Sequence, residues 1–358
     1  MKKSYKLIDL LKFLSAYLVI GIHTRPFLVV SPVLDRMFYY DISNYAVPFF
    51  YACTGYFLIA KQPEKDLQLK LVYRIKKVFK LYLLWSVAYL PLTIYGWIIE
   101  GNLSFKYMLV CIQKYILVGE NFYSWALWYL NGLIFALMLI YILNRRFSFE
   151  FIIRFGMISY LLGIVLNILG KNQDKLSGII IFLVKAYYHI FITTRNGLFQ
   201  SLVFISIGMC VAQKEKLGNL FSVLDKWVVV LSLYVVKIPI SLISGEEYLG
   251  QIFDLPIFCF IFVLIIYGCQ KINLQSGIYA ILRVMSGTIY FVHMYFVAFC
   301  DLILHKEGNH NFESFLISAM GATFVAWFHY YGKLSHVGIK KSIERVIRKI
   351  NIMKDIMN

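Results

Sequence analysis

One lysine and one histidine share a face of the first apolar segment. Lys12 and His23 are eleven positions apart, which in an α-helix is roughly 16 Å along the axis with an angular offset of only about 20°. Ionisable side chains inside membrane spans are costly and mark functional sites, and an imidazole is suited to proton transfer near neutral pH. The spacing predicts a helix wall with a cation at one end and a base at the other, suitable for a tunnel. The alternative is that both side chains reach the two membrane interfaces.

A second histidine lies inside another apolar run. His293 ends the segment Ser286-Gly-Thr-Ile-Tyr-Phe-Val-His293, in which Tyr290 precedes it by three positions. An imidazole at mid-helix is costly in lipid and is expected to face the protein interior. A structural hydrogen bond and a role in positioning substrate both remain open for it.

Two polar or aromatic segments stand just before apolar runs. Thr193-Thr-Arg-Asn-Gly197 contains Arg195 and Asn196, and an arginine there could hold a carboxylate or an oxyanion. Trp125-Ala-Leu-Trp-Tyr-Leu130 contains Trp128, which also fits a membrane-interface belt.

A dense basic run, Tyr73-Arg-Ile-Lys-Lys-Val-Phe-Lys80, includes Arg74, Lys76 and Lys77. Cations of this density suit a polyphosphate ligand such as coenzyme A. Ordinary positive charge on a cytoplasmic connection explains the run equally well. No metal or resident cofactor is expected, because the six cysteines form no CxxC pair or metal-spaced cluster and the remaining histidines have no metal-like spacing.

The elements that position these residues are predicted to be membrane-spanning helices. The chain is 60% apolar and 15% charged, whereas an average soluble domain is nearer half apolar and about a quarter charged. Ten apolar runs are long enough to be spans, and a shorter run, Ile179 to Ile192, is a candidate re-entrant piece. The runs are Leu7 to Val30, Ile42 to Ala60, Val78 to Ile99, Trp125 to Leu143, Phe149 to Leu169, Leu198 to Gln213, Trp227 to Ser244, Ile252 to Cys269, Ile281 to Leu304 and Phe312 to Tyr331.

The distribution of charge predicts the orientation of these helices. Every second connection is basic along the whole chain, from the segment that holds Arg74, through Arg145 and Arg146, to the tail that holds Lys340 and Lys349, so both termini are predicted to be cytoplasmic. The net charge of +17 is therefore a topology signal that also favours contact with anionic lipids, rather than evidence of nucleic-acid binding. We expect a transmembrane domain over 1–336, without a cleaved signal peptide, and a basic amphipathic cytoplasmic tail over 337–358.

Taken in order, these segments resemble the acyltransferase-3 family of integral membrane O-acyltransferases. The family opens with a basic residue, ten residues and a histidine, which here are Lys12 and His23. The other matching segments are Phe49-Phe50 with Thr54-Gly55-Tyr56, Arg74 to Lys80, Leu127-Trp-Tyr-Leu130, and Ser286 to His293. Lys12 and Thr54 depart from the family's usual Arg and Ser, and lysine cannot form the bidentate fork of arginine.

Within the family, the segments Val47-Pro-Phe-Phe50, Leu127-Trp-Tyr-Leu130 and Thr194-Arg-Asn-Gly197 resemble the membrane part of vancomycin-resistance serine racemases. In those proteins a cytoplasmic pyridoxal-phosphate racemase domain follows a membrane domain that is thought to bring in L-serine. The sequence in hand contains no racemase-like segment, which leaves either a standalone relative or the membrane part alone.

The resemblance implies two functions in a bacterial-type cytoplasmic membrane. In the first, acyl-CoA, with acetyl-CoA as the expected donor, docks near Lys12, Arg74, Lys76 and Lys77, and His23 deprotonates a hydroxyl of an envelope glycan at the outer face. Arg195 or His293 then positions substrate or stabilises the oxyanion. In the second, the protein takes up L-serine for a racemase domain or partner, and Arg195 meets the substrate carboxylate. A non-catalytic scaffold is the third interpretation.

Overall fold

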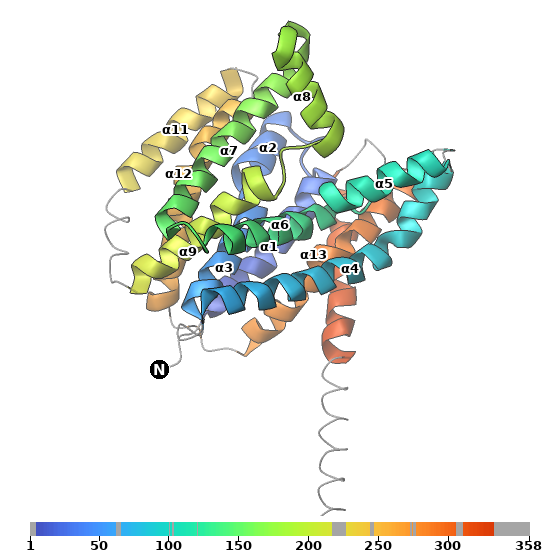
Figure 1. The fold of residues 1–358 in the computed structure, drawn as a ribbon. Helices are drawn as coiled ribbons and strands as arrows, with labels where there is room; N and C mark the ends of the chain where they lie inside the picture. The colour runs from blue at the N-terminus through green and yellow to red at the C-terminus, as the bar shows by residue number, and fades with distance from the viewer. Residues whose placement is uncertain are drawn as a thin grey trace, which may run out of the picture. The chain divides into compact units, whose positions relative to one another are not determined.

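The computed structural model describes residues 5–61, 66–99, 101, 104–119, 121–216, 227–243, 247–272, 274, 277–305 and 311–332. Within these ranges the chain forms helices and turns and contains no β-strand (Figure 1). The predicted all-α class is therefore confirmed, and each of the ten predicted apolar runs is largely helical. The predicted tail over 337–358 lies outside the described residues.

In the described residues, six helices are long and apolar enough to cross a membrane. They are Lys6–Thr24, Leu67–Ile99, Trp125–Leu143, Phe149–Lys171, Gly250–Lys271 and Ile278–Leu302. Shorter apolar helices cover Gly178–Phe191, Gly197–Gln213 and Trp227–Ile240. The protein is thus an all-helical, multi-pass candidate, and the count of ten spans remains a prediction.

The chain divides into two compact units. Unit 1 comprises Met1–Ile8 and Tyr40–Leu274, and unit 2 comprises Asp9–Tyr39 and Gln275–Asn358. The two units therefore each combine segments from distant parts of the sequence.

Unit 1 is built from most of the helices. Its elements are η2 (Ser43–Tyr45), α3 (Ala46–Ala60), α4 (Leu67–Ile99), α5 (Phe105–Leu117), η3 (Trp125–Leu127), α6 (Trp128–Leu143), α7 (Phe149–Lys171), η4 (Gln173–Lys175), α8 (Gly178–Phe191), η5 (Gly197–Ser201), α9 (Leu202–Lys216), α11 (Trp227–Ile243) and α12 (Glu247–Lys271). The π-helix η1 (Met37–Ile42) crosses from unit 2 into unit 1.

The backbones of α3 and α9 touch at two glycines. A Cβ atom on Gly55 would lie 1.9 Å from the Ile205 carbonyl oxygen, and a Cβ on Gly208 would lie 1.9 Å from the Ala52 carbonyl oxygen. Only glycine permits such an approach, which small residues commonly provide where membrane helices cross. The contact fixes α3, which carries the segment Phe49 to Tyr56, against the middle of unit 1.

The basic run and the third apolar run form one helix. The sequence predicts a span from Val78 and places the basic residues in a connection, whereas α4 begins at Leu67 and continues for 33 residues. No glycine or proline interrupts the chain between Leu67 and Leu90, so nothing stops the helix. At 1.5 Å per residue α4 is about 50 Å long, longer than a bilayer core of about 30 Å. The helix α5 is a further element that was not predicted, and the Ser104 side chain caps its start.

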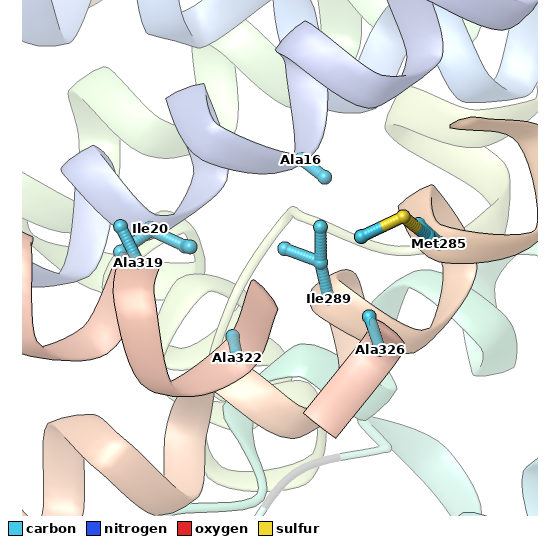
Figure 2. Close-up of a cluster of buried hydrophobic side chains, with 7 residues drawn as sticks. All are labelled: Ala16, Ile20, Met285, Ile289, Ala319, Ala322 and Ala326. Carbon is cyan, nitrogen blue, oxygen red and sulfur yellow. The ribbon is translucent and has the colours of Figure 1, made fainter. Parts of the chain in front are cut away.

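Unit 2 contains most of α1 (Lys6–Thr24), α2 (Pro32–Arg36), α13 (Ile278–Leu302) and a helix over 312–332. Figure 2 shows the apolar cluster where α1, α13 and the helix over 312–332 meet. Its buried members are Ala16, Ile20, Met285, Ile289, Ala319, Ala322 and Ala326. The three alanines let the helix over 312–332 approach its neighbours closely.

The first helix ends earlier than its hydropathy predicts. The apolar run extends to Val30, but α1 ends at Thr24, because Arg25 adopts a left-handed conformation (φ 42°) and Pro26 cannot continue the hydrogen-bonding pattern. The Arg25 guanidinium forms an ion pair with Asp35 and lies 4.3 Å above the centroid of the Tyr39 ring. The turn that follows His23 is therefore anchored.

Candidate functional site

The histidines of the first and ninth apolar runs face each other inside unit 2. The ring centroids of His23 and His293 lie 5.3 Å apart, with an angle of 37° between the ring planes. His23 is in the last turn of α1 and is partly buried, whereas His293 lies in the interior of α13 and is fully buried. The structure thus brings together two side chains that are 270 positions apart in the sequence.

The hydrogen bond of His293 selects its tautomer. Nδ1 lies 2.6 Å from the carbonyl oxygen of Tyr290, and a carbonyl oxygen can only accept, so Nδ1 carries the hydrogen. In the neutral ring Nε2 is then the atom with the free lone pair. Nε2 is buried and has no hydrogen-bond partner in the described part of the protein. A ligand hydroxyl could donate to it, whereas a neutral His293 could not donate from Nε2 to an oxyanion.

Tyr290 lines the same side of α13. Its ring centroid is 6.1 Å from that of His293, nearly edge-on, and the side chain is buried. The predicted residues Tyr290 and His293 therefore form one continuous part of the site with His23.

The face of α1 between Lys12 and His23 packs against other helices of unit 2. Ala16 and Ile20 lie on the same stripe of α1 as both residues, since steps of three or four positions keep one helical face. Both are completely buried in the apolar cluster of unit 2 (Figure 2). The role of this face of α1 as the wall of a tunnel stays a prediction.

An ion pair not anticipated from the sequence lies near Lys12. The Arg283 guanidinium donates to both carboxylate oxygens of Asp9, Nε to Oδ1 at 2.8 Å and Nη2 to Oδ2 at 2.5 Å. Asp9 is buried and Lys12, one turn later, is partly buried. The signal in the sequence was a carboxylate three positions before Lys12, on the same helical face. The bidentate pair ties α1 to α13 at the end opposite the histidines.

Two sequence segments meet inside unit 1. The Tyr51 hydroxyl on α3 donates to the Tyr129 carbonyl oxygen on α6 at 3.1 Å, and the two rings are 4.9 Å apart. The ring centroids of Phe50 and Tyr129 are 6.0 Å apart. Trp128 packs edge-on against Tyr51, with 6.4 Å between the ring centroids. Trp128 is thus part of an interior aromatic group and not only a belt residue at the interface.

Arg74 lies within electrostatic range of this aromatic group. The positive charge of its guanidinium acts on the Tyr129 phenol. Arg74 is partly buried, whereas Lys76 and Lys77 are exposed on the same helix. The basic run therefore presents one cation to the interior of unit 1 and the others to its surface.

Arg195 and Asn196 have different surroundings. The Arg195 side chain is exposed and makes no hydrogen bond or ion pair with any described residue. The Asn196 side chain caps η5, because its Oδ1 accepts from the backbone N–H groups of Leu198 and Phe199, both at 3.0 Å, while its Nδ2 donates to the Tyr187 hydroxyl at 3.0 Å. The polar groups of Asn196 are thus occupied by structural contacts, and its role in binding stays a prediction.

The predicted site residues therefore form two groups, and each group belongs to one unit. Lys12, His23, Tyr290 and His293 belong to unit 2. The others belong to unit 1, and they are Arg74, Lys76, Lys77, Trp128, Arg195 and Asn196.

The family model for the acyltransferase-3 domain, described as an acyltransferase domain, matches residues 5–331. The chain belongs to the acyltransferase-3 family. The match includes both histidines of the pair and the whole of α4, so it joins the residues of the two units in one family domain. No solved structure matches this acyltransferase-3 chain.

Curated relatives of this acyltransferase-3 protein include racemases of enterococci. An amino-acid racemase of Enterococcus faecalis is 30% identical over 220 residues, which are 58% of this chain and 29% of the relative. A serine/alanine racemase of Enterococcus gallinarum is 27% identical over 224 residues, which are 60% of this chain and 30% of the relative. These matches agree with the resemblance to the membrane domain of the vancomycin-resistance racemases. Each aligned region spans less than a third of the relative.

Proposed function

We propose that this protein is a membrane acyltransferase that transfers an acyl group, acetyl in the expected case, from cytoplasmic acyl-CoA to a hydroxyl at the outer face. Membership of the acyltransferase-3 family supports the class of reaction. The observation that carries the proposal is the contact of His23 with His293, in which a buried imidazole nitrogen is available to a ligand hydroxyl. The acceptor we expect is an envelope glycan.

In the proposed reaction, His23 is the general base. It takes the proton of the acceptor hydroxyl while the hydroxyl oxygen forms a bond to the thioester carbonyl carbon. His293 Nε2 accepts a hydrogen bond from a second hydroxyl of the acceptor glycan, because the reacting hydroxyl has a single proton and gives it to His23. The carbon–sulfur bond then breaks, and the coenzyme A thiolate takes the proton from His23, so that the products are an ester and free coenzyme A.

The donor side of the proposal uses the cations of α4. Arg74, Lys76 and Lys77 hold the phosphates of the coenzyme. This assignment requires the ten-span topology with both termini in the cytoplasm and a location in a bacterial-type cytoplasmic membrane. The many exposed apolar side chains, such as Leu84, Val87 and Ile98 on α4, suit contact with lipid tails.

The test is acyl transfer in membrane vesicles supplied with radiolabelled acetyl-CoA on the cytoplasmic side. Label in an alkali-labile ester of the envelope glycan reports the reaction. We expect His23→Ala to lower transfer by about 10²- to 10⁴-fold while the melting temperature of the purified protein stays near that of the wild type. Undiminished transfer by the folded variant would exclude His23 as the base.

Uptake of L-serine is the second candidate, favoured by the racemase relatives. In that case the exposed Arg195 guanidinium meets the serine carboxylate, and the imported serine reaches a cytoplasmic racemase domain or partner. The assay is uptake of labelled serine by proteoliposomes that contain no acyl-CoA. Uptake equal to that of empty vesicles would eliminate this candidate, whereas uptake without any glycan acylation would eliminate the first.

A further inference from the structure

A lysine and two aspartates that are not among the candidate site residues meet inside unit 1. Lys237 lies on α11, Asp254 on α12 and Asp41 in η1. The Lys237 ammonium nitrogen is 2.8 Å from an oxygen of Asp41 and 2.8 Å from an oxygen of Asp254. The side chains of Lys237, Asp41 and Asp254 are only 3%, 9% and 5% exposed. We call these three residues the ion triad.

The charges of the ion triad do not sum to zero when all three groups are ionised. One ammonium and two carboxylates carry a formal net charge of −1, and an uncompensated charge in a low-dielectric interior is costly. Several neutral groups of the described residues surround the triad, and they are the Asn44 amide, the Tyr45 hydroxyl, the Tyr40 carbonyl, the Tyr234 ring and the Tyr160 phenol. A proton bound by one of the carboxylates would supply the missing positive charge.

The neighbours of Asp254 are hydrogen-bond donors. The Tyr45 hydroxyl donates to Oδ1 at 2.8 Å, and the Asn44 amide nitrogen donates to Oδ2 at 3.1 Å. Donor groups cannot coordinate a metal cation through their hydrogens. In addition, the Lys237 ammonium already occupies the position between the two carboxylates that a cation would take. This arrangement favours a proton over a second cation as the species that neutralises the triad.

We infer that the ion triad is a proton-binding site in which Asp41 and Asp254 together hold one proton. A carboxylate takes the proton from hydronium and releases water, which changes the net charge of the triad from −1 to zero. Intramembrane groups of this kind commonly belong to proton relays. The inference does not depend on the proposed acyl transfer, because it uses none of the residues assigned to that reaction.

The test is infrared spectroscopy of the purified full-length chain in lipid nanodiscs. A protonated carboxyl has a C=O stretching band that a carboxylate lacks. We expect the wild type to show such a band at neutral pH, and we expect it to be lost in Asp41→Asn or in Asp254→Asn. The matched control is Asp174→Asn, which changes an exposed aspartate of η4 and should leave the band intact.

Two outcomes would overturn the inference. One is a neutral-pH spectrum that neither asparagine variant changes, since both carboxyls would then be ionised. The other is a band that disappears when Na⁺ is added at constant pH, since the triad would then bind a metal cation. If an asparagine variant does not fold, the corresponding glutamate variant, Asp41→Glu or Asp254→Glu, keeps a carboxyl, and a shifted band replaces the lost one as the expected result.

Discussion

His293 is held by the carbonyl of Tyr290, one turn earlier on the same helix, and this bond leaves its Nε2 directed into the protein interior without a partner among the described residues. A buried polar atom without a partner is costly. At a site that also contains His23 at 5.3 Å, the cost is explained if a substrate supplies the missing hydrogen bond.

The first prediction separates the two nitrogens of His293. In His293→Asn the amide nitrogen can still donate to the Tyr290 carbonyl, but the atom equivalent to Nε2 is absent. We expect transfer of labelled acetyl to fall at least tenfold, with a melting temperature close to that of the wild type. His329→Asn is the control, because His329 is exposed and bonds only Thr288 among the described residues. Equal activity of the two variants would contradict the role of Nε2.

The second prediction concerns the contact of α3 with α9. Gly55→Ala would place a methyl group 1.9 Å from a backbone carbonyl oxygen that cannot move without shifting α9. We expect a loss of about 1–3 kcal/mol or more, measured as a lower melting temperature or as failure to accumulate in membranes. Gly287→Ala on α13 is the matched control, because nothing lies within 4 Å of its added methyl group. An unchanged Gly55→Ala protein would show that the helices can separate at little cost.

The third prediction concerns Asn196. Asn196→Ala removes the acceptor for two backbone N–H groups, and loss of such a cap costs about 0.5–2 kcal/mol. Asn196→Asp keeps an acceptor oxygen and should retain most of the stability. Thermal unfolding of both variants distinguishes this structural role from binding, because a purely ligand-binding asparagine would leave the melting temperature of the free protein unchanged in both.

The fourth prediction compares the cations of α4. Arg74 is partly buried beside Tyr129, whereas Lys76 is exposed. We expect Arg74→Gln to weaken binding of acetyl-CoA at least tenfold and to a similar extent at low and high salt. Lys76→Gln should have a smaller effect that disappears at high salt, because surface charges are screened. Titration of the purified variants with acetyl-CoA provides the dissociation constants, and equal losses would contradict the distinction.

Hydropathy predicted the helices well because each long apolar run must satisfy its backbone hydrogen bonds internally. Hydropathy did not predict the ends of helices correctly where a local signal, such as a proline, competes with the apolar composition. Pro26 ends α1 six residues before the apolar run ends, and the basic residues from Lys70 to Lys80 continue α4 because no glycine or proline stops it. Ser104 caps the start of α5, but hydropathy does not take capping residues into account.

The candidate site was predictable only in part. The helical spacing of Lys12 and His23 and the position of His293 were evident from the sequence, but the contact of His23 with His293 depends on how α1 packs against α13. The partners Asp9 and Arg283 are 274 positions apart, and Lys237 is 196 positions from Asp41. No local pattern indicates such pairs, since each partner alone is an isolated charge in or beside an apolar run.

The glycine contact between α3 and α9 also has a mechanical consequence. Two backbones that touch at carbonyl oxygens have no side chains between them to change rotamer, so neither helix can slide or tilt alone. Within unit 1 they should move as one rigid body throughout any working cycle. A conformational change that opens a substrate path in this unit would then have to arise in other helices, which move around this fixed pair.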